Sequence, residues 1–443
     1  MNDIWSSKKE SPMLGLTGMG GGATGFMWAG GGVLYDIFAF GRNAPPAYAR
    51  LGLNDRVNRS SPTQIPSGTD DGWKYLWNGG MHYTAVSFAT REDGTMWSWG
   101  SAGDGMTGTN CQGPPSICDR AYSSPVQIGT DTNWGQLAYG EKHAVAVKTD
   151  GTMWNWGQYQ RLAKVPGVPN PQQGNRSSPM QVGTDTNWAY DETKQKVWAD
   201  NYKNFAIKTD GTLWCWGTAG PAGALMGSMG MNDDSSEPNN RFSRSSPMQV
   251  GTNTTWDYMC DGYYHQASAR KTDGTMWVWG SSNEGALGLG NEIARSSPTQ
   301  LPGNWSKVCV NGRCSYGIKT NGTLWSWGGY NNYGQRGLNG QGFVQTQYPV
   351  GWVPETKIIS SPAQVGTNTN WHDITAKEDY CLALKSDGSY WAWGRNQYGE
   401  LGLNDLTHRS SPTQIPGKSG GRTDILYGNF GGGDSNSFLL TKQ

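Results

Sequence analysis

The sequence predicts an all-β fold, a seven-bladed β-propeller of four-stranded blades, from its composition and its repetition. Of the 443 residues, 65 are glycine and 23 are tryptophan, while charged residues make up 16 % against about 25 % in ordinary globular domains. Two short phrases also occur seven times each along the chain. Such repetition predicts a repeat architecture, and tryptophan rings packed between neighbouring sheets can supply its core.

The first phrase is Asp-Gly-Thr-x-Trp-x-Trp-Gly or a variant of it. Its Asp-Gly pair predicts a two-residue hairpin turn in which both residues take a positive φ. The strand that follows places its two tryptophans on the same face, because side chains alternate along a strand. The phrase occupies residues 93–100, 150–157, 210–217 and 273–280, with variants at 321–328 and 387–394 and a degenerate copy at 38–41.

The second phrase, Ser-Ser-Pro, predicts a strand that tolerates proline at a sheet edge. A tryptophan after it, such as Trp188, marks the start of a further strand, and residues 143–148 are typical of another. We expect each blade to begin with the Ser-Ser-Pro strand and to end with the Trp-x-Trp-Gly strand. The phrase begins at Ser60, Ser123, Ser177, Ser245, Ser296, Ser360 and Ser410.

The two ends of the chain predict how the ring closes. Residues 437–442 match the third strand of a blade, and residues 33–41 match the fourth strand. We therefore expect one blade to combine three strands from about residues 410–443 with one strand from the N-terminal side. In this organisation residues 31–443 form the propeller, and residues 1–30 form a glycine-rich N-terminal arm.

The arrangement of Trp-x-Trp-Gly, Gly-x-x-His and Ser-Pro resembles the repeat of the regulator of chromosome condensation family, most closely its bacterial and bacteriophage members. The resemblance covers about residues 31–443 and implies the seven-bladed propeller. The Gly-x-x-His element stands at residues 79–82, 140–143 and 262–265. The family's Gly-x-x-Gly-x-Leu-Gly loop is clear at residues 284–290 and 398–403, and we expect insertions to replace it elsewhere.

The resemblance implies three alternative roles. A nucleotide exchange factor bound to chromatin would carry a basic tail, but Lys+Arg and Asp+Glu are 35 each, and no basic run exceeds Lys8-Lys9. Nucleic-acid binding is therefore not expected. An ultraviolet photoreceptor would carry a Gly-Trp-Arg-His-Thr motif, which is absent from the sequence. The third role is a scaffold or recognition propeller.

Insertions after Gly100, Gly157, Gly217 and Gly328 leave the repeat at the same point and should lie on one side of the ring. Tyrosine and tryptophan make adaptable protein contacts. In the N-terminal arm, spaced apolar residues among glycines resemble the leaders of virion proteins from tailed bacteriophages. The residues predicted to bind partners are Tyr330, Tyr333, Tyr348 and Trp352 in the longest insertion, and Leu16, Phe26 and Trp28 in the arm.

We therefore expect a non-enzymatic structural or recognition propeller, a bacteriophage virion protein of the tail, fibre or decoration class. Its arm would contact other virion proteins, and its insertion loops would contact a host-surface ligand. The alternative is a guanine-nucleotide exchange factor or another intracellular, cytoplasmic protein-binding propeller. The sequence has no apolar run of about 20 residues, so no membrane span is expected.

No motif for catalysis or for a cofactor occurs in the sequence, and neither a cofactor nor a metal is expected. The five histidines lie in different repeats, and His82, His143 and His265 occupy the repeat's own strand position. The seven cysteines are interpreted mainly as small buried apolar residues. Cys111 and Cys118 are close enough in sequence for a disulfide bond, which is left open.

Overall fold

A computed structural model gives the fold of the chain. It describes residues 34–43, 50–66, 72–77, 86–101, 103–110, 121–158, 162, 174–200, 202–217, 227–232, 244–260, 265–310, 314–329, 331–339, 358–377, 379–424, 430–431 and 435–442. Leu34–Gln443 is one compact unit, and Met1–Val33 is a second unit that lies outside the described residues. The assignment of residues 1–30 to a separate arm therefore stays a prediction.

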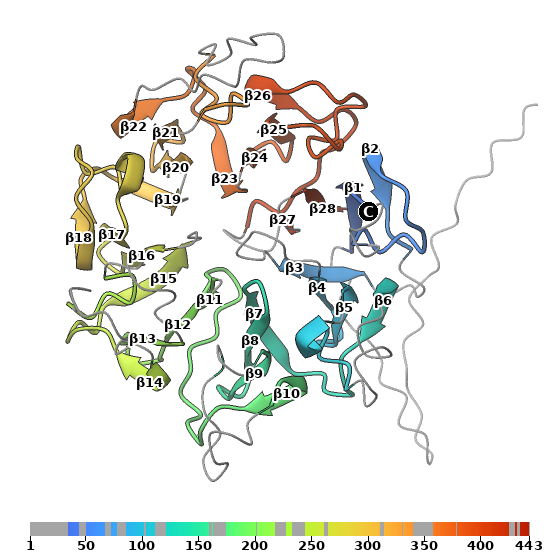
Figure 1. Ribbon diagram of the computed structural model, residues 1–443, viewed down its shortest axis with the longest axis vertical. Coiled ribbons are helices and arrows are strands. Elements are labelled where there is room, and N and C mark those ends of the chain that lie inside the picture. Colours follow the sequence, from blue (N-terminus) through green and yellow to red (C-terminus); the bar gives the residue numbers. More distant parts are fainter. Residues whose placement is uncertain are drawn as a thin grey trace, which may run out of the picture. The chain divides into compact units, whose positions relative to one another are not determined.

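Within Leu34–Gln443, antiparallel sheets stand around a central axis as seven blades (Figure 1). We number the blades I to VII along the chain. Their strands, from the axis outward, are β3 (Trp73–Trp77), β4 (Val86–Arg91), β5 (Met96–Gly100) and β6 (Tyr122–Gln127) in blade I; β7 (Trp134–Tyr139), β8 (His143–Lys148), β9 (Met153–Gly157) and β10 (Arg176–Gln181) in blade II; β11 (Val197–Ala199), β12 (Lys203–Ile207), β13 (Leu213–Gly217) and β14 (Arg244–Gln249) in blade III; and β15 (Trp256–Cys260), β16 (Gln266–Lys271), β17 (Met276–Gly280) and β18 (Arg295–Leu301) in blade IV.

The remaining blades follow the same order. They are β19 (Trp305–Cys309), β20 (Cys314–Lys319), β21 (Leu324–Gly328) and β22 (Ile359–Gln364) in blade V; β23 (Trp371–Ala376), β24 (Tyr380–Lys385), β25 (Tyr390–Gly394) and β26 (Arg409–Gln414) in blade VI; and β27 (Phe430–Gly431), β28 (Asn436–Lys442), β1 (Tyr35–Gly41) and β2 (Arg59–Gln64) in blade VII. One residue pair, Tyr35 with Trp73, joins the sheets of blades VII and I. The predicted seven-bladed, all-β fold is confirmed.

The ends of the chain close the ring in one blade, as predicted, but the expected division of its strands is wrong. Blade VII takes β27 and β28 from the C-terminal side and β1 and β2 from the N-terminal side, two strands from each. Strand β28 pairs with β1 along its whole length, from Tyr35 opposite Lys442 to Gly41 opposite Asn436. The error came from β26, which pairs with β25 and so completes blade VI.

The same error affects the predicted limits of every blade. The Ser-Ser-Pro strand does not begin a blade: it returns beside the Trp-x-Trp-Gly strand that precedes it and forms the outer edge. In blade II, for example, β10 pairs with β9, with Arg176 opposite Gly157 and Gln181 opposite Trp154. An outer edge has no ladder partner on one side, which is where a strand can accept proline.

The Asp-Gly-Thr phrase forms a hairpin turn, but not the two-residue turn that we expected. In blade II the Gly151 N–H donates to the Lys148 carbonyl and the Lys148 N–H donates to the Thr152 carbonyl, which is a β-turn followed by a bulge. Gly151 has a φ of 79°, whereas Asp150 is not among the described residues with a positive φ. Only the glycine position requires the left-handed region.

The aspartate and threonine of this phrase fix the neighbouring tryptophan. The Asp150 carboxylate accepts hydrogen bonds from the Thr152 N–H at 3.0 Å and from its hydroxyl at 2.6 Å. The same hydroxyl accepts the Trp154 indole N–H at 2.9 Å. The bond from the Thr152 hydroxyl is the main reason that the pKa of Asp150 is lowered. Blades I, III, IV, V and VI repeat this chain of bonds, with Asn321 in place of the aspartate in blade V and Ser389 in place of the threonine in blade VI.

Each of these six blades also contains three tryptophans with a cation beside them. In blade II the ring centroid of Trp134 lies 6.2 Å from those of Trp154 and Trp156. The Lys148 ammonium lies 4.7 Å from the Trp134 centroid and 4.1 Å from that of Trp154. Such cation–π contacts stabilise a buried positive charge. The equivalent cations are Arg91, Lys208, Lys271, Lys319 and Lys385.

The loop from the third to the fourth strand of a blade holds the next blade. In blade I the Met106 carbonyl accepts the indole N–H of Trp156 in blade II at 2.9 Å. The Asn110 N–H donates to the carbonyl of Ser177, the first serine of the next Ser-Ser-Pro, at 2.7 Å. A Cβ on Gly105 would lie 2.6 Å from the Arg176 carbonyl oxygen, so this close approach requires glycine. We call the backbone bond to the first serine the rim latch.

We call the contact between two consecutive blades a seam, and the described residues form rim latches at six seams. Their donors and acceptors are Asn54 and Ser123, Asn110 and Ser177, Asn232 and Ser296, Gly290 and Ser360, Asn339 and Ser410, and Asn404 and Ser60. The prediction that insertions replace this loop was therefore wrong for blades I, III and V, where the described residues include the loop and its latch. At the seam between blades II and III, most of the corresponding segment, residues 159–161 and 163–173, lies outside the described residues.

Candidate protein-binding face

The antiparallel order of the strands gives the ring two different faces. One face, the turn face, carries the starts of the innermost strands and the Asp-Gly-Thr turns. The opposite face, the loop face, carries the connections from the third to the fourth strands, including the rim-latch loops. The third strands from which the four predicted insertions leave end on the loop face, at Gly100, Gly157, Gly217 and Gly328.

On the turn face, several ion pairs bury the cation and expose the carboxylate. The side chain of the cation is 7–25 % exposed in these pairs, and that of the acid is 51–63 % exposed. The pairs are Lys74 with Glu192, Lys148 with Asp131, Lys208 with Asp185 and Arg422 with Asp424, at 2.7–3.0 Å. Although the chain is neutral, this face therefore presents negative charge outward.

Two of these acids have a lowered pKa. The hydrogen bond from Lys74 is the main cause of the lowered pKa of Glu192. The hydrogen bond from Arg422 similarly lowers the pKa of Asp424. Both carboxylates therefore stay ionised at neutral pH and are available to a cationic group from outside.

On the turn face, blade III carries six more residues before its innermost strand than blade II does. In blade II a single residue, Gly135, separates Trp134 from the next residue paired with β8. In blade III, residues 189–195 separate Trp188 from Lys196, whose carbonyl accepts the Ile207 N–H of β12. We call residues 189–196 the axial strap.

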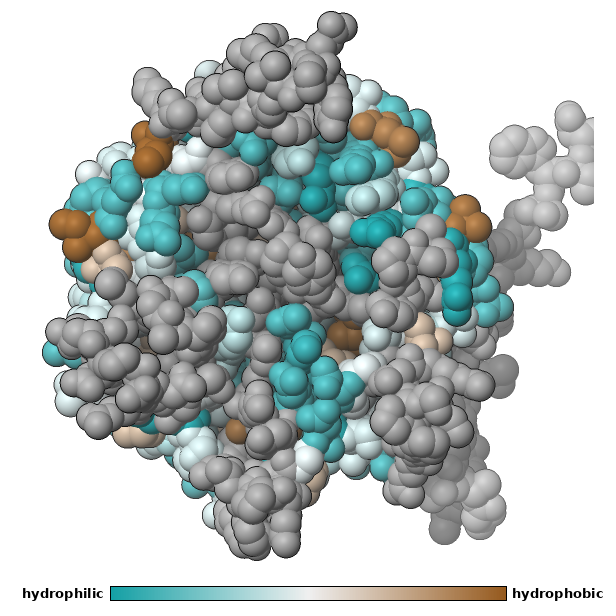
Figure 2. Space-filling model, in the orientation of Figure 1, coloured by the Kyte–Doolittle hydropathy of each residue, from teal (hydrophilic) through white to brown (hydrophobic). Residues whose placement is uncertain are grey.

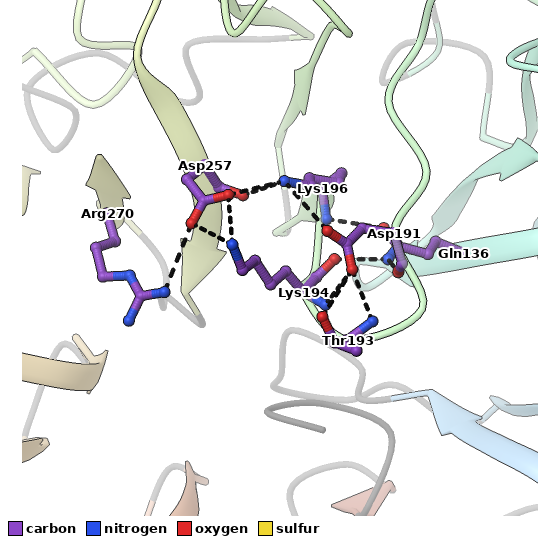
Figure 3. A network of polar contacts seen from close by, with 7 residues as sticks. All are labelled: Gln136, Asp191, Thr193, Lys194, Lys196, Asp257 and Arg270. Carbon is purple, nitrogen blue, oxygen red and sulfur yellow. Dashed lines mark hydrogen bonds and ion pairs between the residues drawn. The ribbon is translucent and has the colours of Figure 1, made fainter. Parts of the chain in front are cut away.

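The axial strap contacts the blades on both sides of blade III (Figure 3). In blade II, the Gln136 side-chain amide donates to the carbonyls of Asp191 at 2.6 Å and Lys194 at 2.7 Å. The Gln136 side-chain carbonyl accepts the Lys196 N–H at 2.8 Å. These three bonds use the whole amide group of one buried side chain.

In blade IV, the strap binds the carboxylate of Asp257. Lys194 lies 2.8 Å from it, Lys196 lies 3.2 Å from it, and Arg270 of β16 approaches at 3.5 Å. Burial raises the pKa of Asp257, but the hydrogen bond from Lys194 and the charge of Lys196 outweigh burial, and the pKa lies below its usual value. One carboxylate thus binds three cations.

The strap also reaches blade I, past blade II. The Glu192 carboxylate pairs with Lys74 at 3.0 Å, and the Glu192 carbonyl accepts the Tyr75 hydroxyl at 3.2 Å. The guanidinium of Arg422, which precedes β27, donates to the Lys74 carbonyl at 3.1 Å. The strap therefore connects blades I to IV near the axis.

The sequence signal for the strap was overlooked. Trp188 stands 22 residues before Asp210, whereas Trp134 stands 16 residues before Asp150. Comparing these spacings between repeats would have located a six-residue insertion. The contacts of the inserted residues could not have been predicted in this way, because their partners Gln136 and Asp257 belong to other repeats.

Of the residues predicted to bind partners, the structure describes Tyr333. It lies on the loop face, with its ring edge-on to that of His408 at 5.0 Å and its N–H bonded to the Gln335 side chain at 2.8 Å. It thus belongs to the seam between blades V and VI. The other predicted residues lie outside the described residues: Tyr330, Tyr348, Trp352, Leu16, Phe26 and Trp28.

Two of the described histidines, His143 and His265, are buried among protein groups. His143 bonds Asn204 at 2.8 Å, and His265 stacks on Tyr202. The described cysteines with side-chain data are buried: Cys215, Cys309, Cys314 and Cys381. Cys111 and Cys118 lie outside the described residues, so the disulfide question stays open.

No group of three or more His, Cys, Asp or Glu side chains in the described part of the chain is arranged to hold a metal ion. Within the same residues, no helix combines the length and apolar character needed to cross a bilayer.

Comparison with known proteins agrees with this fold. The family model described as "Regulator of chromosome condensation (RCC1) repeat" matches residues 273–315 and 387–432. The ultraviolet-B receptor UVR8 of Arabidopsis thaliana is 24 % identical over 388 residues, 83 % of this chain and 75 % of that protein. The X-linked retinitis pigmentosa GTPase regulator of Homo sapiens is 32 % identical over 144 residues, 32 % of this chain and 13 % of that protein.

Among solved structures, Prp20p of Saccharomyces cerevisiae superimposes with a TM-score of 0.69 at 18 % identity, covering 93 % of this chain and 92 % of that one. The fold defines the class: this chain is a seven-bladed propeller, and its residues 273–315 and 387–432 are similar to the RCC1 repeat. Within that class, the relatives are named as receptors and regulators. They give no support to the bacterial or bacteriophage origin that we expected.

Proposed function

We propose that this chain is a non-enzymatic, protein-binding propeller that acts as a regulator or scaffold and docks a basic protein partner on its turn face. The observation that carries the proposal is the orientation of the ion pairs on that face. Their cations lie beneath, several against tryptophan rings, while Asp131, Asp185, Glu192 and Asp424 project outward.

The exposed apolar surface supports a polar mode of docking. On the face drawn in Figure 2, the brown areas are small and separate from one another. The exposed large apolar side chains come from different blades: Val57, Met180, Met248, Ile293, Ile358 and Leu406. Surface apolar residues scattered singly need no partner. Charge complementarity would instead guide the encounter and fix its orientation.

Relatives support protein binding as the general role. The structure of Prp20p was reported with its binding properties to Gsp1p and histones, and a second structure holds the same protein bound to Kap60. At 18 % identity, this similarity indicates that the two proteins share a fold, and it does not indicate that they share binding partners. Which protein this chain binds is therefore left to experiment.

The test is capture of partners from an extract of the source by the immobilised chain. The turn-face variant combines Asp131→Asn, Asp185→Asn and Glu192→Gln, and the matched control is Glu292→Gln, an exposed acid on the loop face. We expect proteins retained by the wild type and by the control to be lost from the turn-face variant and to elute with salt. Equal retention by all three chains would refute docking on this face.

The virion location is a separate prediction that the comparisons do not support. It proposes contacts with virion proteins through Leu16, Phe26 and Trp28, and with a host-surface ligand through the insertion loops. A mass-spectrometric inventory of particles purified from the source tests it directly. Detection in stoichiometric amounts would support the virion location, and consistent absence would remove it in favour of a cytoplasmic one.

A further inference from the structure

The lysines beside the tryptophans of the turn face differ in whether a carboxylate accompanies them. In blade II the Lys148 ammonium lies against two indole rings and pairs with Asp131 at 2.8 Å. Blade III repeats this arrangement with Lys208 and Asp185 at 2.7 Å. We call a lysine and its two tryptophans a cage. Four of the cages are Lys148 with Trp134 and Trp154, Lys208 with Trp188 and Trp214, Lys271 with Trp256 and Trp277, and Lys385 with Trp371 and Trp391.

The cages of blades IV and VI have the same rings but no carboxylate beside the ammonium. Lys271 and Lys385 each lie 3.8 Å from the nearer ring centroid. Within the described part of the chain, neither ammonium makes an ion pair or a hydrogen bond. The lysines of all four cages are similarly buried, at 5–8 % exposed. Burial outweighs the attraction of the turn aspartates Asp273 and Asp387 and lowers the pKa of Lys271 and Lys385.

One position in the segment before the innermost strand accounts for this difference. That position is Asp131 in blade II and Asp185 in blade III, but Asn253 in blade IV and Asn368 in blade VI. The backbone of the segment is the same in all four blades. Its glycine has a φ of 60–64°, and the backbone N–H of its tryptophan donates to a glycine carbonyl of the preceding hairpin turn at 3.0–3.3 Å. Asparagine therefore stands where the acid does, and its amide carries no charge to balance the lysine.

A carboxylate approaches the ammonium of a cage from the solvent side. The Asp131 and Asp185 side chains are 51 % and 53 % exposed, although the lysines that they contact are buried. Asn253 and Asn368 are exposed as well. A carboxylate on another molecule can therefore reach the lysines of blades IV and VI along the same path.

We propose that the cages of blades IV and VI are two carboxylate-binding sites, and that acidic side chains of a protein partner take the positions there that Asp131 and Asp185 take in blades II and III. Each lysine donates a charge-assisted hydrogen bond to an aspartate or glutamate of the partner. Because paired and unpaired cages lie on different blades, these contacts fix how the partner is rotated on the ring. The identity of the occupant rests on the proposed function, whereas the sites themselves can be tested without a partner.

The experiment is nuclear magnetic resonance of the full chain, isotope-labelled at the lysine ε carbon. The probe is N-acetylglutamate α-amide, which carries one side-chain carboxylate, and its uncharged glutamine analogue is the control. At constant ionic strength, we expect the charged probe to shift the Lys271 and Lys385 signals saturably and to leave those of Lys148 and Lys208 unchanged. The glutamine analogue should shift none of the four.

Matched substitutions convert one kind of cage into the other. Asn253→Asp gives blade IV the acid that blade II carries, so Lys271 should lose its response to the probe while Lys385 keeps it. Asp131→Asn removes the acid from blade II, so Lys148 should gain a response. Both variants should fold, because each places at this position a residue that other blades already carry there.

The absence of a saturable shift at Lys271 and Lys385 would overturn the sites, and so would an equal response of Lys271 in the wild type and in Asn253→Asp. Capture from the extract tests the occupant. We expect the double variant Asn253→Asp, Asn368→Asp to lose the partner, as the turn-face variant does. If only the turn-face variant loses the partner, docking on this face stands and the acidic contacts are refuted.

Discussion

The seam between blades I and II and the seam between blades II and III solve the same packing problem by different means. At the first, the loop of blade I bonds Trp156 and Ser177, so the contact lies toward the outer edge and uses backbone groups. At the second, Gln136 and the axial strap make the contact near the axis, and charged side chains support it. The difference shows that consecutive blades of one ring can be joined by backbone bonds toward the rim or by side-chain contacts near the axis.

The largest expected effect comes from breaking a latched seam. Gly105→Ala places a Cβ 2.6 Å from the Arg176 carbonyl oxygen at a φ of 77°. We expect a loss of roughly 2–5 kcal/mol in the free energy of unfolding, from overpacking and left-handed strain. Chemical denaturation measures it.

Gly183→Ala is the control for that substitution. Gly183 has a φ of 64°, but its Cβ would meet nothing within 4 Å. It should therefore cost only the conformational strain, about 1–2 kcal/mol. Equal losses at the two glycines would show that the close approach of loop and outer strand contributes nothing.

A smaller loss is expected at the seam between blades II and III. Gln136→Ala removes three hydrogen bonds and leaves the carbonyls of Asp191 and Lys194 without their donor. We expect a loss of about 1–3 kcal/mol in the free energy of unfolding. Gln136→Glu keeps the size of the side chain but loses the amide donor, so it should recover little of that stability in the same denaturation experiment.

The pH dependence follows from Asp257. Its pKa in the folded chain lies below the value of about 3.9 expected when unfolded. Its contribution is therefore complete above that value and is lost as the pH falls through the folded pKa. The charged groups that face it are Lys194, Lys196 and Arg270.

We expect the wild type to lose more stability than Asp257→Asn between about pH 5 and pH 3. Thermal unfolding across this range, with both chains in the same buffers, makes the comparison. Parallel curves would mean that the Asp257 contacts contribute nothing to the folded state.

The smallest effect is expected on the turn face. Asp131→Asn removes an ion pair whose acid is 51 % exposed. We expect a change of about 0–1 kcal/mol in the free energy of unfolding, because exposed pairs contribute little. A loss well above this range would mean that the outward carboxylates are structural and would weaken the case for docking.

The fold could be predicted from the repeats because the contacts that form each hairpin lie within a single repeat. The Asp150-Gly151-Thr152 turn and the tryptophans after it act within one hairpin, so the sequence contains the whole interaction. The limits of the blades were predicted wrongly, because which strand β10 pairs with depends on its return across a long loop.

The axial strap could not be interpreted from one repeat. Lys194 and Asp257 are 63 residues apart, and Glu192 and Lys74 are 118 apart. Their contacts exist only because the ring brings four blades together at the axis. The spacing after Trp188 gives the position of the insertion, and the partners follow only from the three-dimensional arrangement.

The most direct test of this account is residue-resolved hydrogen exchange of the wild-type chain, comparing the rim-latch amides with the Lys196 amide. The latch donors are Asn54, Asn110, Asn232, Gly290, Asn339 and Asn404. The account predicts that these six amides exchange at one slow rate that does not change with salt, and that the Lys196 amide exchanges faster as salt is added. Latch amides that exchange as fast as free loops, or a Lys196 amide that responds to salt no more than they do, would contradict it.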